Sequence, residues 1–237
     1  MKVMGFLIAV DGVDASGKQT QTELLFERIK KERDARLISF PAYESQSSAL
    51  VKMYLNGEFG TDPQSVSPYA ASVFFAGDRY ASFKSDWESD FNSDKIIIAD
   101  RYVSSNMIHQ ASKIENPSDK DKFLEWLFDL EFNKLGLPKP SITIFLDMPP
   151  EYGAMLMKER ANKITGDSKK DIHESAGNYL RKSYENALFV AKKYNWQIIS
   201  CVNENGIRTI EDIHEEIWQC LVNLGYFKIS EIFEFIY

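Results

Sequence analysis

Apolar residues along this chain are arranged in two alternating patterns. Short, almost unbroken apolar runs occupy residues 5–11, 35–40, 95–100, 141–148 and 196–202. Between them, apolar residues recur every three or four positions over residues 19–31, 48–55, 68–91, 104–113, 120–135, 150–160, a stretch ending near residue 194, and 210–224. Unbroken runs of this length are typical of buried strands, and the wider spacing is typical of helices that cover them.

Strands that are apolar throughout must be covered on both faces, as in a parallel sheet that lies between helices. We therefore predict an α/β protein with three layers, α/β/α, around a five-stranded, mostly parallel sheet. The sequence contains no internal repeat and no linker, so we expect one domain over residues 1–237.

Charge and cysteine content narrow the classes of partner. The chain has 237 residues and a formal net charge of -7. An acidic surface argues against broad binding to nucleic acids or membranes, which usually needs a basic face.

The first apolar run is too short to span a bilayer and has no small-residue cleavage site after it. Cys201 and Cys220 lie in apolar stretches without metal-ligand spacing, so we expect buried thiols in a reducing cytoplasm.

The strongest chemical signal is a glycine-rich loop between the first predicted strand and the first predicted helix. Gly12 and Gly17 let the backbone curl so that its N–H groups can face phosphate oxygens. Lys18 adds a positive charge for the β- and γ-phosphates. We predict an ATP-binding loop made of Gly12, Val13, Asp14, Ala15, Ser16, Gly17, Lys18, Gln19 and Thr20.

Transfer of a phosphoryl group from ATP uses Mg²⁺, and the sequence offers an unusual set of ligands for it. Gln19 follows the loop lysine, where a serine or threonine hydroxyl normally binds the ion. A glutamine amide oxygen can bind Mg²⁺ directly or through water. Asp100 ends the third strand, at the edge of the sheet that also carries the loop. We predict Asp100 and Gln19 as metal ligands, and Arg101 as a cation that stabilises the transferred phosphoryl group.

Several short motifs occur in the order and approximate spacing of the thymidylate kinase family. They are Gly12-Val13-Asp14, Phe40-Pro41, Asp78-Arg79, Asp100-Arg101-Tyr102, Ser105 to Gln110, and the runs at residues 146–151 and 171–174. The chain resembles this family from Phe6 to Leu221. The resemblance implies the P-loop kinase fold, transfer of the ATP γ-phosphate to dTMP in dTTP synthesis, and a homodimer.

The resemblance also implies how the acceptor nucleotide is held. It implies that Asp14 accepts from the deoxyribose 3′-OH, Phe75 stacks on the base, Arg79 reads a base carbonyl, Arg101 clamps the acceptor phosphate, Tyr102 packs below the sugar, and Phe40 belongs to the same site. Ser105 and Gln110 match positions at the base edge, although a surface or capping role suits both residues equally well. His109, His173 and His214 are scattered, and we expect them to be structural or solvated.

A polar segment after the sixth predicted helix resembles the family's lid, at about residues 161–172. The phosphate loop contains no arginine, so we expect the lid cation to be Arg160, with Lys163 as the next candidate. The predicted catalytic residues are then Lys18, Asp100, Arg101 and Arg160. Tyr43 stands about where family members often carry an arginine that contacts the acceptor phosphate. That phosphate is already an anionic nucleophile, so no strong general base is expected.

Two other functions remain open from the residues alone, both with nucleotides or nucleosides as ligands. A kinase for another deoxynucleotide or a deoxynucleoside would use the same loop. Deoxynucleoside kinases are expected to carry Glu-Arg after the third strand, where this chain has Asp100-Arg101. A non-catalytic P-loop nucleotide-binding protein usually keeps the hydroxyl residue after the lysine and shows an Asn-Lys-x-Asp run, which this chain lacks.

Overall fold

The computed structural model describes residues 5–163 and 177–227, with side chains described for residues 5–157 and 179–227. The helices and strands are β1 (Phe6–Gly12), α1 (Lys18–Ile29), β2 (Ala35–Ser39), α2 (Ala49–Leu55), α3 (Pro68–Ser82), α4 (Glu88–Asn92), β3 (Ile96–Asp100), α5 (Val103–His109), α6 (Pro117–Phe128), β4 (Ile142–Asp147), α7 (Pro150–Lys163), α8 (Gly177–Lys193), β5 (Gln197–Ser200), β6 (Val202–Asn203), β7 (Gly206–Ile207) and α9 (Ile210–Asn223). Two further segments, Phe83–Trp87 and Asp129–Lys134, are π-helical.

The central sheet has five strands in the order β2-β3-β1-β4-β5, and every neighbouring pair is parallel. The predicted fold class is therefore confirmed. The register pairs Val10 of β1 with Asp100 of β3, so these two strands end side by side. The loops that follow them therefore meet at one edge of the sheet, as expected for the ligand site of an open α/β sheet.

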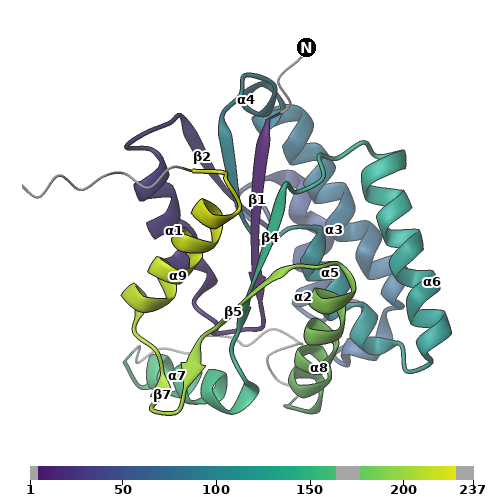
Figure 1. Ribbon diagram of the computed structural model, residues 1–237. Coiled ribbons are helices and arrows are strands. Elements are labelled where there is room, and N and C mark those ends of the chain that lie inside the picture. Colours follow the sequence, from purple (N-terminus) through teal and green to yellow (C-terminus); the bar gives the residue numbers. More distant parts are fainter. Residues whose placement is uncertain (1–4, 164–176, 228–237) are drawn as a thin grey trace, which may run out of the picture.

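Helices cover both faces of this sheet, with α1 and α9 on one face and α3, α5, α6 and α8 on the other (Figure 1). Strand β1 shows why both faces need a cover. Ile8 and Val10 are fully buried in the core with α1 and α9, while Leu7 and Ala9 are fully buried in the core on the opposite face. Side chains alternate along a strand, so an unbroken apolar run supplies both cores at once.

Local sequence signals explain where the helices beside the site begin and end. Helix α3 begins after Ser67, whose hydroxyl accepts from the N–H of Ala70, and Pro68 occupies the first turn, where no amide donor is needed. The single helix predicted over residues 68–91 is divided into α3, the π-helical segment and α4. The hairpin of β6 and β7 was not predicted, because strands of two residues leave no alternating pattern.

Within the described residues, no helix is long and apolar enough to cross a membrane. The cysteine expectation holds for Cys201, which is buried, whereas Cys220 is only half-buried; both thiols are free.

Candidate active site

The loop between β1 and α1 curls around its own lysine, and its two glycines are required by space and by backbone conformation. A Cβ atom on Gly12 would lie 2.5 Å from the hydroxyl of Ser16 and 2.8 Å from the carbonyl oxygen of Leu146. Gly17 has a φ angle of 84°, in the left-handed region that favours glycine. Ala15 also has a positive φ, of 59°. The predicted phosphate loop is thus a tight turn that leads directly into the N-terminus of α1.

Lys18 is buried inside this loop. Its ammonium group donates to the carbonyl oxygens of Gly12 and Val13 at 2.9 and 2.8 Å, and to the hydroxyl of Ser16 at 3.4 Å. Burial and the positive charge of Arg101 lower the pKa of Lys18 to about 8, although Asp14 acts in the opposite direction. The lysine is therefore held by neutral acceptors close to the place where the loop can receive phosphate.

The two predicted metal ligands differ in their surroundings. Asp100 ends β3 beside the loop, and its Oδ1 is buried without a hydrogen-bond partner among the described residues. Burial raises the pKa of Asp100. Gln19 is exposed, and its amide donates to Glu23 one turn further along α1 at 2.9 Å. Thr20, beside it, is half-buried. Asp100 is thus at the loop, while Gln19 is turned along the surface of α1.

The unpaired oxygen of Asp100 fits a Mg²⁺ ion that is shared with bound phosphates. Mg²⁺ is commonly held by one or two carboxylates together with substrate phosphates and water. Within the part of the chain that the structure describes, no group of three or more His, Cys, Asp or Glu side chains could form a complete metal cage. The residues present therefore suit an ion that arrives with the nucleotide.

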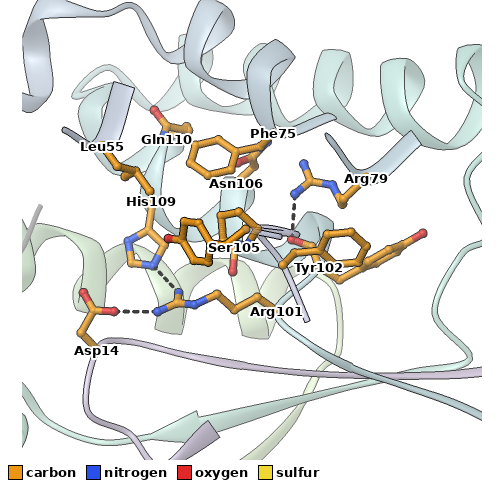
Figure 2. Close-up of a pocket in the computed structure, with 13 residues that line it drawn as sticks. Asp14, Leu55, Phe75, Arg79, Arg101, Tyr102, Ser105, Asn106, His109 and Gln110 are labelled. Carbon is orange, nitrogen blue, oxygen red and sulfur yellow. Dashed lines mark hydrogen bonds and ion pairs between the residues drawn. The ribbon is translucent and has the colours of Figure 1, made fainter. Parts of the chain in front are cut away.

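Arg101 follows β3 in a constrained conformation. Its φ of 67° is unusual for a residue other than glycine, and its N–H donates to the carbonyl oxygen of Val10 at 3.0 Å. The guanidinium donates to Asp14 at 2.7 Å and lies 3.4 Å from Nε2 of His109. Figure 2 shows Arg101 reaching between these two side chains. The carboxylate of the phosphate loop is therefore paired with the arginine that follows β3.

Asp14 and Arg101 each stabilise the charged form of the other. Burial alone would raise the pKa of Asp14, but the charges of Arg101 and Lys18 outweigh it and hold that pKa well below its ordinary value. Burial acts against the charge on Arg101, but the carboxylates of Asp14, Asp11 and Asp100 together outweigh it, so the pKa of Arg101 is raised. Both side chains are charged at neutral pH.

A pocket opens beside Arg101, with an empty volume of about 590 Å³ that includes the open space at its mouth. Its lining residues are Asp14, Phe40, Pro41, Tyr43, Leu55, Phe75, Arg79, Arg101, Tyr102, Ser105, Asn106, His109 and Gln110. All the acceptor residues predicted from the sequence lie in this set, and most are labelled in Figure 2. The structure therefore brings together residues that are up to 96 positions apart, from Asp14 to Gln110.

Aromatic rings form one part of the pocket wall. Phe75, on α3, meets the ring of Tyr54 edge-on, with centroids 6.1 Å apart. Tyr102 is fully buried, packs on Phe40 at 5.9 Å and donates its hydroxyl to the carbonyl oxygen of Pro138. Burial raises the pKa of the Tyr102 hydroxyl. Packing and a hydrogen bond thus fix the Tyr102 ring independently of any ligand.

Ser105 and Gln110, the two residues with open roles, have different surroundings. The hydroxyl of Ser105 donates to Asp11 at 2.8 Å, and so does the hydroxyl of Ser104. Gln110 is almost completely buried, and its Oε1 has no hydrogen-bond partner among the described residues. Ser105 is therefore used to hold α5 against β1, whereas Gln110 still offers a polar atom at the pocket.

Arg79 makes the most deeply buried ion pair in the described structure. Nε of Arg79 donates to Oε2 of Glu131 at 2.7 Å, and Nη2 donates to Oε1 of the same carboxylate. The side chains of Arg79 and Glu131 are 2% and 0% exposed. Nη1 of Arg79 lies 3.5 Å from the carbonyl oxygen of Tyr102 (Figure 2).

Four residues that shape the site were given no role in it from the sequence, including His109, which we expected to be structural or solvated. Asp11 is fully buried and accepts from the backbone N–H of Gly12 as well as from both serines of α5. Asn106 and His109 line the pocket from α5. Glu131 could have been noticed, because it continues the core-facing spacing of Leu124 and Leu127 with a charged residue.

Of the remaining predicted site residues, the structure describes Tyr43 but not the side chain of Arg160. Tyr43 lines the pocket, as its place in the sequence suggested. Arg160 belongs to α7, but its side chain, and that of Lys163, lies outside the described residues. So does most of the predicted lid at residues 161–172.

Comparison with known proteins adds four consistent findings. Residues 10–217 match the family model described as thymidylate kinase. A probable thymidylate kinase of Thermococcus onnurineus is 30% identical over 213 residues, which are 89% of this chain and 94% of that protein. A thymidylate kinase of Mycobacterium tuberculosis is 32% identical over 173 residues, which are 72% of this chain and 78% of that protein. The structure of thymidylate kinase from Candida albicans has the same fold, with a TM-score of 0.66 at 24% identity, over 94% of this chain and 93% of that one.

Proposed function

Because the chain belongs to the thymidylate kinase family, we propose that it transfers the γ-phosphoryl group of ATP to dTMP, giving dTDP and ADP. The observation that supports this most directly is the ion pair of Arg101 and Asp14, at 2.7 Å. It joins the phosphate loop to the pocket lined by Phe75, Arg79 and Tyr102, so a donor on one side and an acceptor on the other would meet at Arg101.

In the proposed reaction, an oxygen of the dTMP phosphate attacks the γ-phosphorus, and the bond from that phosphorus to the β-bridging oxygen breaks. No side chain has to remove a proton from the anionic nucleophile. Lys18 would exchange the carbonyls of its loop for phosphate oxygens, and Arg101 would balance the charge on the transferred group. Mg²⁺ would neutralise part of the phosphate charge, with Asp100 as its proposed protein ligand.

Two further elements of the proposal complete the machinery. The segment at about residues 161–172 is proposed as the family's lid, and Arg160 is proposed as the cation at its edge; the side chain of Arg160 and residues 164–172 lie outside the described residues. Gln19 is proposed as the second ligand to the ion, either directly or through water, after its side chain has left Glu23.

We also propose that the protein acts as a homodimer through α3. Tyr69, Val73 and Tyr80 are 42%, 50% and 40% exposed and share one side of that helix. An exposed apolar stripe of this kind is typical of a contact with another chain. Sedimentation of the purified protein measures the oligomeric state, and a monomer at micromolar concentration would contradict this part of the proposal.

The activity is tested by coupling ADP release to a spectrophotometric readout with ATP and a panel of acceptors. We expect dTMP to stimulate ADP release strongly, and thymidine not to do so. A preference for thymidine would indicate a deoxynucleoside kinase. ADP release that no acceptor increases would indicate a nucleotide-binding protein without kinase activity, and would overturn the proposal.

A further inference from the structure

Glu131 binds one edge of the Arg79 guanidinium, next to the acceptor pocket. Arginine has five N–H donors, in a planar fork that matches a carboxylate. Glu131 takes the donors on one edge of this fork, from Nε and from Nη2. The remaining terminal nitrogen, Nη1, lies 3.5 Å from the carbonyl oxygen of Tyr102, which is too long for a strong hydrogen bond. Arg79 lines the pocket, and Glu131 leaves the N–H donors of Nη1 unused.

The position of Glu131 is itself fixed by the backbone. It lies in the π-helical segment Asp129–Lys134, which extends α6, and its carbonyl oxygen accepts from the N–H of Leu137 at 3.0 Å. Single π-helical turns occur frequently at functional sites. The side chain is fully buried, so the carboxylate cannot move to water without opening the core. The two bonds to Glu131 thus fix the plane of the arginine before any ligand arrives.

We propose that Glu131 is a positioning residue that sets base selectivity by presenting Nη1 of Arg79 to the acceptor base. This inference rests on the proposed function. Nη1 can only donate, so it favours a base with a carbonyl oxygen at that edge and disfavours one with an amino group. Thymine and uracil carry a carbonyl at position 4, whereas cytosine carries an amino group. The arginine held by Glu131 therefore selects dTMP and dUMP over dCMP.

The test is the substitution Glu131→Gln, which keeps the shape of the side chain but removes its charge and one acceptor. We expect kcat/KM for dTMP and for dUMP to fall about 30-fold, within the range for a charge-assisted hydrogen bond. Most of the change should be in KM, with kcat altered less than about 3-fold. The value for dCMP should change much less, so that the preference for dTMP over dCMP also falls about 30-fold.

Asp90→Asn is the matched control. Asp90 also pairs with an arginine, Arg36, and with Lys95, but it lies outside the pocket lining. Its loss should leave the ratio of dTMP to dCMP unchanged. If Glu131→Gln does not fold, Glu131→Asp keeps the buried charge and withdraws it by one methylene; the ratio should then fall about 5-fold, between wild type and Glu131→Gln.

A second comparison tests whether Glu131 acts through Arg79. In an Arg79→Lys background the fork is absent, so Glu131→Gln should change the ratio of dTMP to dCMP less than about 2-fold further. An equal loss with dTMP, dUMP and dCMP would assign Glu131 a purely structural role and would overturn the inference. A wild-type protein that phosphorylates none of the three would instead contradict the proposed function.

Discussion

The phosphate loop and the acceptor pocket hold their cations in opposite ways. On the loop side, Lys18 is bound by two main-chain carbonyls and a hydroxyl, all of them neutral. On the acceptor side, Arg101 is paired with Asp14, and Arg79 is paired with Glu131. The lysine can thus exchange neutral partners for charged phosphate oxygens, whereas both arginines are oriented by carboxylates before a ligand binds.

This difference suits the chemistry of the two nucleotides. A flexible lysine is a point charge that can follow the phosphates of ATP, while a planar arginine reads direction as well as charge. The loop side therefore carries general phosphate binding, and the pocket side carries recognition of one acceptor. Substitutions on the two sides should therefore impair different properties of the enzyme: phosphoryl transfer on the loop side and acceptor recognition on the pocket side.

Lys18→Ala removes the cation of the phosphate loop and should cause the largest loss of activity. Without its ammonium group, the charge of the transferred phosphoryl group is left uncompensated, and we expect kcat to fall at least about 10³-fold. ADP release at saturating ATP and dTMP measures this loss. Fluorescence titration with dTMP should show acceptor affinity within about 3-fold of wild type, since the pocket keeps its arginines. Activity near the wild-type level would mean that the loop has been assigned wrongly.

The contrast also explains how much of the molecule could be predicted. The five parallel strands and the phosphate loop follow from patterns within short segments, such as the apolar run of β1 and the glycines before Lys18. The resemblance pointed to Phe75, Arg79 and Tyr102, and the structure places all three around one pocket.

Contacts between distant segments could not be predicted in this way. Glu131 pairs with a residue 52 positions earlier, and Asp11 bonds serines 93 and 94 positions later. Neither contact follows a period along the chain, so each depends on the packing of whole helices against the sheet. The exposed amide of Gln19 is likewise a consequence of its rotamer, which the sequence does not specify.

The pH dependence of the two sides should also differ. The pKa of Lys18 is lowered to about 8, so the free enzyme loses this charge as the pH rises through 8, while Arg101 stays charged. We expect kcat/KM for ATP to decline above about pH 8, approaching tenfold per pH unit, because this parameter reports the free enzyme. With ATP saturating, kcat/KM for dTMP should stay level to higher pH, since bound phosphates keep the lysine protonated.

The expected fall in kcat/KM above pH 8 is not caused by unfolding, because deprotonation of Lys18 changes the stability of the folded state in the opposite direction. Between pH 8 and 9 the unfolded chain binds more protons at Lys18 than the folded chain, so this group makes the folded state more stable as the pH rises. Above about pH 9 the buried Cys201, whose pKa is raised to about 12, acts in the opposite direction. Lys113→Gln is the control, because the pKa of Lys113 is also lowered to about 8, outside the pocket lining. If the decline in kcat/KM for ATP above pH 8 disappears in Lys113→Gln, it does not come from the titration of Lys18.

Gln19→Thr should have the smallest effect, and it sharpens the comparison within the loop itself. The amide of Gln19 contacts only Glu23 among the hydrogen bonds of the described residues, on the exposed side of α1. A threonine hydroxyl at this position would offer Mg²⁺ a direct ligand, so we expect kcat within about 3-fold of wild type and half-maximal activity at a lower Mg²⁺ concentration. Glu23→Gln weakens the same contact from its other end and should leave the Mg²⁺ requirement unchanged. A fall in kcat of more than about tenfold in Gln19→Thr would show that the glutamine has a role that a hydroxyl cannot replace. The loop side would then also depend on one particular side chain, as the acceptor pocket does.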